Sequence, residues 1–274
     1  MPGKGVLPNP LDADSFDAQN GYRNQVCPAC LSPEVRYHLE VDGFAIDRCT
    51  RCGHAFVRDV PSDREIFLFY QNAYQEEGSF QPKLRWHRRL KYGVGAALIR
   101  LLFVDRERVR LLDVGCSQGD LLEFFKASGK YEAQGLDFAE GPVAWARSRG
   151  LDVSQGDVER MGYPEGRFDM VVAVHTVEHM QDPERSLREI HRVLAPGGYF
   201  FAVCPCLSHI KARLAGEDWK YWGPPGHLNY FTGTSFRRLL SRLGFRVRYS
   251  SCLGNQAHVR VMARRIQPRG APGR

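Results

Sequence analysis

The amino-acid sequence predicts an α/β protein. Its main domain should be a mostly parallel sheet of seven strands with helices on both faces, and a small cysteine-containing module should precede it. Three observations support this prediction. From Arg110 onward, strand-like and helix-like segments alternate along the chain. Phe168–Val174 is a continuous apolar run, which is typical of a central parallel strand buried on both faces. Four cysteines stand in two C-x-x-C pairs before residue 60.

The spacing of these cysteines predicts a zinc ribbon. The four are Cys27, Cys30, Cys49 and Cys52, and 18 residues separate the two pairs. Four thiolates complete a tetrahedral zinc shell with no open position, so the ion should be structural. Asp42-Gly43 predicts a hairpin turn between strands in residues 35–41 and 44–48. Unpaired structural cysteines are the alternative interpretation.

Hydrophobic runs and turn residues predict the elements of the main domain. Its seven strands are expected in residues 111–114, 133–136, 152–154, 168–174, 199–203, 245–250 and 257–266. Helices are expected in residues 121–127 and 235–243. Another should start at Asp182-Pro183, an N-cap followed by a proline, and end at Pro196-Gly197-Gly198. A short turn at Gly254-Asn255 joins the last two strands, so one of them should run antiparallel.

Candidate ligand-binding residues follow the strands of this sheet. Ligands of such sheets bind at the carboxyl ends of the strands. Gly115 and Gly119 follow the first strand, where they let the backbone approach a ligand closely. Asp137 follows the second strand, Asp157 the third and His175 the fourth. The first loop lacks the G-x-G-x-x-G pattern of dinucleotide sites, which favours a nucleoside ligand without a pyrophosphate.

At these residues the sequence resembles class I S-adenosylmethionine-dependent methyltransferases of types 11, 12 and 23. The matching segments are 112–119, 135–137, 156–158, 168–179 and 192–198. Ser117 departs from the family loop D-x-G-x-G-x-G, which has glycine at this position. The resemblance implies a Rossmann-like fold over residues 109–266 and S-adenosylmethionine as cofactor. It also implies the cofactor-binding residues Asp113, Gly115, Cys116, Gly119, Asp137, Phe138, Asp157, Val158 and His175.

The candidate catalytic residues are Glu178, His179 and His227. An acceptor hydroxyl or carbon acid must lose a proton before it is methylated, and histidine is the commonest base. His179 follows the fourth strand in a Glu-His pair, and His227 stands in a P-P-x-H-x-x-Y-F segment, residues 224–231. Either histidine could instead be structural. With Phe69-Tyr70 and Tyr74, this layout resembles a bacterial group similar to ubiquinone-pathway and sugar-modifying methyltransferases.

The chain is expected to divide into five segments. These are a disordered tail (1–23), the zinc ribbon (24–60), a helical linker that caps the cofactor (61–108), the methyltransferase domain (109–266) and a basic tail (267–274). Within the domain, residues 205–232 lack periodicity and hold several aromatic residues, which predicts a lid or substrate loop. A packed insertion is the alternative. A linker helix is expected in residues 83–103.

Charge is distributed unevenly along the chain. Residues 1–80, 81–110, 111–231 and 232–274 carry net charges of −5, +7, −5 and +10. Basic flanks could attract RNA, a phosphorylated substrate or a membrane surface, and a solvated face is the alternative. We expect a cytoplasmic protein, because residues 1–21 lack a signal-peptide pattern and 94–104 are too short to span a bilayer.

These observations favour methyl transfer to a small molecule, at an oxygen or carbon of a sugar, quinone, lipid or similar metabolite. An RNA methyltransferase that uses the ribbon and the basic flanks is the main alternative. A non-catalytic zinc-ribbon binding protein is a weaker one. The sequence favours no particular oligomeric state.

Overall fold

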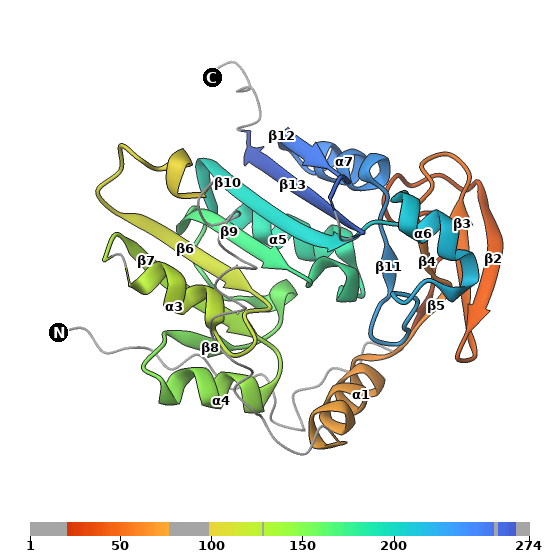
Figure 1. Ribbon diagram of the computed structural model, residues 1–274, viewed down its shortest axis with the longest axis horizontal. Coiled ribbons are helices and arrows are strands. Elements are labelled where there is room, and N and C mark those ends of the chain that lie inside the picture. The colour runs from red at the N-terminus through yellow and green to blue at the C-terminus, as the bar shows by residue number, and fades with distance from the viewer. Residues whose placement is uncertain (1–20, 77–98, 128, 255–256, 267–274) are drawn as a thin grey trace, which may run out of the picture.

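The computed structural model describes residues 21–76, 99–127, 129–254 and 257–266. Its main sheet has seven strands in the order β12-β13-β10-β9-β6-β7-β8 (Figure 1). The strands are β6 (Val109–Val114), β7 (Tyr131–Asp137), β8 (Val153–Gln155), β9 (Phe168–Val174), β10 (Leu194–Pro205), β12 (Phe245–Ser251) and β13 (His258–Arg265). The five strands from β6 to β10 are paired in parallel, whereas β13 runs antiparallel to both β10 and β12. The expected mostly parallel sheet with one antiparallel strand is therefore confirmed.

Helices cover both faces of the sheet, as the alternation of segments predicts. They are α3 (Asp120–Lys126), α4 (Glu140–Ser148), α5 (Pro183–Val193) and α7 (Gly233–Arg242). On one face, apolar side chains of α3 and α4 pack with Ile99 and Phe103 against alternate residues of the central strands. On the other face, α5 and α7 pack against the intervening residues of the same strands. Period-two alternation of strand side chains thus supplies both halves of the core.

The helix that begins at Asp182 starts as expected but ends earlier. The Asp182 side chain accepts a hydrogen bond from the Arg185 backbone N–H at 3.0 Å, and Pro183 occupies the first turn. Residues 196–198 do not form the expected loop, because β10 already begins at Leu194. Its register with β9 shifts between Leu194 and Tyr199. The expected turn is therefore an irregularity inside a longer strand, and Gly197 and Gly198 are part of it.

The cysteine module forms a second, four-stranded sheet in the order β11-β4-β3-β2. Its strands are β2 (Val35–Val41), β3 (Phe44–Cys49), β4 (Ala55–Val57) and β11 (Asn229–Tyr230). The first three come from the N-terminal module, with the expected hairpin between β2 and β3. The fourth comes from the P-P-x-H-x-x-Y-F segment and pairs antiparallel with β4. Figure 1 shows β11 crossing from the main domain to this sheet.

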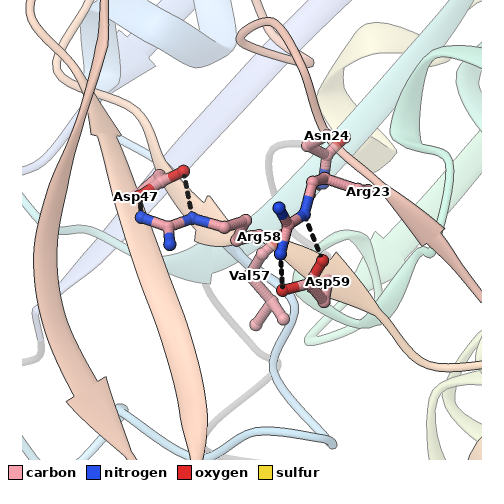
Figure 2. Close-up of polar contacts among 6 residues, drawn as sticks. All are labelled: Arg23, Asn24, Asp47, Val57, Arg58 and Asp59. Carbon is pink, nitrogen blue, oxygen red and sulfur yellow. Dashed lines mark hydrogen bonds and ion pairs between the residues drawn. The ribbon is translucent and has the colours of Figure 1, made fainter.

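Short strands and ion pairs hold the chain that enters and leaves the module. Strand β1 (Tyr22–Arg23) pairs antiparallel with β5 (Asp59–Val60). Figure 2 shows the two arginine–carboxylate pairs at this position, Arg23 with Asp59 and Arg58 with Asp47. The second pair is bidentate, with contacts of 2.9 and 2.6 Å, and its carboxylate is buried. A bidentate, buried pair fixes geometry better than an exposed one does.

The aromatic segment 205–232 packs against the module. It contains α6 (Ile210–Ala215), a 3-10 turn at Gly216–Asp218 and β11. Trp219, Trp222 and Tyr230 form one buried cluster with apolar residues of β2, β3 and β4. The segment is therefore packed, and its main apolar contacts are with the cysteine module. A role of the segment in substrate binding stays a prediction.

The linker is described in part. Helix α1 (Asp63–Glu76) follows the module, and residues 99–102 are helical. The rest of the expected 83–103 helix, most of the 1–23 tail and the 267–274 tail lie outside the described residues. Among the described residues, no helix combines the length and hydropathy that a membrane span requires.

Candidate active site

A cavity of about 370 Å³ opens where β6, β7, β8 and β9 end. The loops after these four strands supply most of its wall, and α1 supplies Asp63, Ile66 and Tyr70. Of the site residues expected from the sequence, it is lined by Gly115, Asp137, Phe138, Asp157, Val158, His175 and His179. These residues span more than sixty positions, and the parallel order of the strands brings them together.

The loop after β6 is shaped by positive φ angles. Gly115 has φ 72° and Gly119, which caps α3, has φ 79°. A Cβ atom at Gly115 would lie 2.3 Å from Thr176 Oγ1. That hydroxyl donates a hydrogen bond to the Val114 carbonyl at 2.9 Å, so it cannot easily move away. Ser117, where the family pattern has glycine, also takes a positive φ of 47° and carries the backbone strain that this implies.

Asp137 ties this loop to the end of β7. Its carboxylate accepts hydrogen bonds from the backbone N–H groups of Ser117 at 2.7 Å and Ala139 at 2.9 Å. Burial raises the pKa of Asp137, while these backbone N–H bonds act in the opposite direction. The carboxylate lines the cavity. It can therefore accept further hydrogen bonds from a ligand there.

Three of the expected cofactor-binding residues belong to β6 or the loop after it but do not line the cavity. These are Asp113, Cys116 and Gly119. Asp113 is buried in β6, where burial and the charge of Asp137 raise the pKa of its carboxyl far above the usual value. The Cys116 sulfur fills the space that a side chain at Gly135 would need, at 2.6 Å from such a Cβ atom. The direct ligand contacts expected of these residues stay predictions.

The three expected catalytic residues lie together beside the cavity. Glu178 and His179 form a 3-10 turn after β9, and His227 lies on the loop before β11. The rings of His179 and His227 have centroids 4.8 Å apart. His179 lines the cavity, whereas Glu178 and His227 do not.

Hydrogen bonds fix the tautomers of both imidazoles. His179 Nδ1 lies 2.7 Å from the Gly226 carbonyl oxygen, and His227 Nδ1 lies 2.7 Å from the Tyr221 carbonyl oxygen. A carbonyl only accepts, so each Nδ1 carries a proton, and in the neutral form of either ring the lone pair lies on Nε2. Burial lowers the pKa of His179, and Glu178 opposes this shift. His179 is therefore neutral at neutral pH.

Glu178 is the most deeply buried member of this group. Its side chain is 1% exposed, and Oε1 lies 3.2 Å from His175 Nδ1. Burial opposes its ionisation, but the hydrogen bond with His175 acts in the opposite direction, and the net effect is a lowered pKa of Glu178. Oε2 is buried and has no hydrogen-bond partner in the part of the chain that the structure describes.

Two groups of site residues had no role in the sequence prediction. Tyr70 of α1 lines the cavity, and its hydroxyl lies 2.9 Å from His179 Nδ1. Met180 and Gln181, directly after the Glu-His pair, also line it. The Phe69-Tyr70 pair was a visible signal for Tyr70, although nothing in the sequence placed it beside His179.

The four module cysteines present the geometry of a zinc site. Their sulfur atoms all lie within 4.8 Å of one another. Cys27 and Cys52 have sulfurs 3.6 Å apart, and Cys30 and Cys49 have sulfurs 3.7 Å apart. Zinc–sulfur bonds of about 2.3 Å in a tetrahedron place sulfurs at roughly this separation. The donor set therefore fits one four-coordinate zinc ion.

Comparison with known proteins identifies the family. Residues 86–250, more than half of the chain, match the family model described as a methyltransferase domain. The chain belongs to this family. It is an S-adenosylmethionine-dependent methyltransferase, as the resemblance of its strand-end motifs implies.

Several methyltransferases of known name are similar to this one. The demethylmenaquinone methyltransferase of Thermus thermophilus is 31% identical over 201 residues, which cover 62% of this chain and 86% of that protein. The ubiquinone biosynthesis O-methyltransferase of Marinobacter nauticus is 35% identical over 117 residues, 38% of this chain and 48% of that one. The ajmaline N-methyltransferase of Rauvolfia serpentina is 34% identical over 124 residues. The matched residues cover 42% of this chain and 40% of the plant protein. This chain therefore spans less than half of the length of the Marinobacter and Rauvolfia proteins.

Solved structures share the fold of this methyltransferase. A protein of Pyrococcus horikoshii aligns with a TM-score of 0.54 and 20% identity, over 65% of this chain and 91% of that one. The [4+2]-cyclase SpnF aligns with a TM-score of 0.52 and 21% identity, over 62% of this chain and 79% of its own. Because one of these neighbours is named a cyclase, the fold alone does not specify the reaction.

Proposed function

We propose that this methyltransferase transfers a methyl group from S-adenosylmethionine to an oxygen or carbon of a small-molecule acceptor. A sugar, a quinone, a lipid or a similar metabolite would be suitable. The cofactor supplies an electrophilic methyl group on a positively charged sulfur. The residues that would hold it are Gly115, Asp137, Phe138, Asp157, Val158 and His175, which line the cavity.

One observation carries this proposal. His179 lines the cavity with its Nδ1 proton held by the Gly226 carbonyl, so its Nε2 can accept a proton. A neutral imidazole beside the methyl donor can activate a hydroxyl or a carbon acid. Glu178 and His227 lie behind it and would set its charge and orientation. The similarity to a demethylmenaquinone methyltransferase and to a ubiquinone biosynthesis O-methyltransferase supports a small-molecule acceptor.

We also infer that the four-cysteine module holds a structural zinc ion. Four thiolates leave no position for a substrate or a water molecule. The ion would fix the turns at each end of the ribbon. Through β4 and β11 these turns support the loop that carries His227.

A labelling experiment tests the acceptor class. Purified protein and methyl-labelled S-adenosylmethionine are incubated with an extract of the source organism, and label is followed into RNA, protein, lipid and small-molecule fractions. We expect label in the small-molecule or lipid fraction, unchanged by nuclease. Label that is lost on RNase treatment would contradict the proposal and favour the RNA alternative.

A further inference from the structure

The Glu178, His179 and His227 side chains have the arrangement of a metal site. Each offers one ligand atom, and the three atoms lie within 4.8 Å of one another. They belong to the 3-10 turn after β9 and to the loop before β11. The Leu228 backbone N–H donates to the Glu178 carbonyl at 2.8 Å and holds the two segments together. The group is therefore assembled by the fold and does not depend on mobile side chains alone.

Both imidazoles are oriented as metal ligands usually are. Each Nδ1 proton is donated to a backbone carbonyl, that of Gly226 for His179 and that of Tyr221 for His227, both at 2.7 Å. In the neutral form of each ring, Nε2 is then the nitrogen that can bind a metal. Metal-binding histidines commonly donate their second ring N–H to a carbonyl in this way, which fixes the tautomer and the ring.

The third ligand is a carboxylate oxygen that needs a partner. Glu178 Oε2 is buried and makes no hydrogen bond with any of the described residues, and the whole side chain is 1% exposed. An ionised oxygen without a partner in such surroundings is costly, and a cation would remove that cost. Two imidazoles and one carboxylate form the donor set of catalytic zinc sites that keep one position open.

We propose that Glu178, His179 and His227 bind a divalent transition-metal ion such as Zn²⁺, in addition to the ion of the cysteine module. The proposal rests on the methyl transfer to a small molecule proposed above, and it replaces the role of His179 as a base with that of a metal ligand. With the ion bound, both Nε2 lone pairs are ligands. The ion then orients the acceptor and lowers the pKa of its hydroxyl, whose proton passes to solvent. The acceptor class that this site selects is an oxygen-bearing molecule, such as a phenol, an enol or a vicinal diol.

Counting zinc ions per chain tests the site. The full chain and its variants are dialysed against Zn²⁺, freed of excess metal by gel filtration and analysed by elemental mass spectrometry. We expect two ions per chain in the wild type and one in His179→Asn and His227→Asn. Asparagine keeps a donor near the Nδ1 position and lacks Nε2. His191→Gln, which changes an imidazole outside the group, should keep two.

Cobalt distinguishes the two sites by their ligands. Co²⁺ added to protein with zinc in the cysteine module should give weak visible d–d bands without thiolate charge-transfer bands, and both Asn variants should lose them. One zinc ion in every protein, or a cobalt spectrum dominated by thiolate bands, overturns the proposal. S-adenosylhomocysteine binding by each variant checks folding, and Glu178→Gln replaces any variant that fails this check.

The same samples separate this proposal from the proposed function. Methyl transfer by protein with one zinc ion per chain would overturn the second ion and leave the imidazoles as bases. Two zinc ions per chain without methyl transfer to a small molecule would support the ion and contradict the proposed function.

Discussion

At the scale of single residues, Asp137 connects the loop after β6 to the ligand cavity. Its carboxylate accepts N–H groups from the loop after β6 and from the start of the next helix. It also lines the cavity. A side chain with both contacts organises the backbone and can bind ligand hydroxyls. Changing Asp137 should therefore weaken cofactor binding both by disturbing the loop backbone and by removing a hydrogen bond to the ligand.

We predict that Asp137→Asn lowers the affinity for S-adenosylhomocysteine by about 10- to 100-fold, the range for losing one hydrogen bond to a charged group. Asn has only one acceptor atom and would place an NH₂ group near a backbone N–H. Isothermal titration calorimetry measures the change. The control is Asp152→Asn, which alters an exposed contact with Gln134 and should leave affinity unchanged. Equal affinity in all three proteins would show that Asp137 does not bind the cofactor.

Glu159 makes stability depend on pH. Burial and the nearby charge of Asp157 raise its pKa to about 7, from 4.5 in an unfolded chain, although Arg185 lies 3.2 Å away. Because the folded pKa is higher, the contribution of Glu159 is fully present below pH 4.5 and is lost as the pH rises to about 7. Glutamine has no such loss. We predict that the free energy of unfolding of Glu159→Gln, relative to that of the wild type, increases by about 2 kcal/mol as the pH rises from 5.5 to 8. Denaturant unfolding measures this difference. A difference that stays constant with pH would contradict the assigned shift.

How far the sequence predicts the site depends on which contacts are local. The residues that follow parallel strands, such as Asp137 and His175, could be placed at one edge because strand direction fixes where each strand ends. Tyr70 could not, because its contact with His179 joins segments 109 residues apart. The sequence also did not show that Asp113, in strand β6, would not line the cavity. The sequence thus predicts the edge of the sheet, while packing decides which side chains reach the ligand.

At the scale of elements, β11 joins the ribbon sheet to the active site. It pairs with β4 directly after the loop that carries His227. Inside this contact, the Asn229 side chain donates to the Met180 carbonyl at 2.6 Å and lies 3.3 Å from His54 Nε2. Both Asn229 and His54 are buried. Nothing in the sequence predicted this strand, because a two-residue strand has no periodicity and its partner is far along the chain.

We predict that Asn229→Ala destabilises the protein by about 2 kcal/mol, because it leaves His54 and the Met180 carbonyl without a buried partner. Thermal and denaturant unfolding measure the loss. Ser148→Ala removes an exposed hydrogen bond to the Trp145 carbonyl and serves as the control, with almost no expected change. Similar stability of both variants would mean that this contact does not hold β11 in place.

At the scale of the whole molecule, the ribbon and the methyltransferase sheet share one core. Cys27, Cys49 and Phe56 of the ribbon belong to the same buried cluster as Phe231 and Phe236 of the main domain. Backbone contacts add to this, since the Thr232 hydroxyl donates to the Cys52 carbonyl at 3.1 Å. The two parts should therefore unfold together.

We predict that removing the proposed zinc ion of the ribbon with a chelator lowers the melting temperature of the whole chain in one transition. The binding energy of a structural ion contributes directly to folding, and the common core transmits its loss. Differential scanning calorimetry of the treated protein and of a zinc-restored sample tests this. Two separate transitions, with the upper one unchanged, would show that the ribbon folds independently.

The central claim is that methyl transfer takes place at the Glu178, His179 and His227 side chains. The most direct test is the initial rate of label transfer into the small-molecule fraction, measured for the wild type and for the double variant His179→Asn with His227→Asn. S-adenosylhomocysteine affinity is measured in parallel. We predict a rate lower by about 10²- to 10⁴-fold with cofactor affinity retained. A double variant that transfers label at the wild-type rate would contradict the claim.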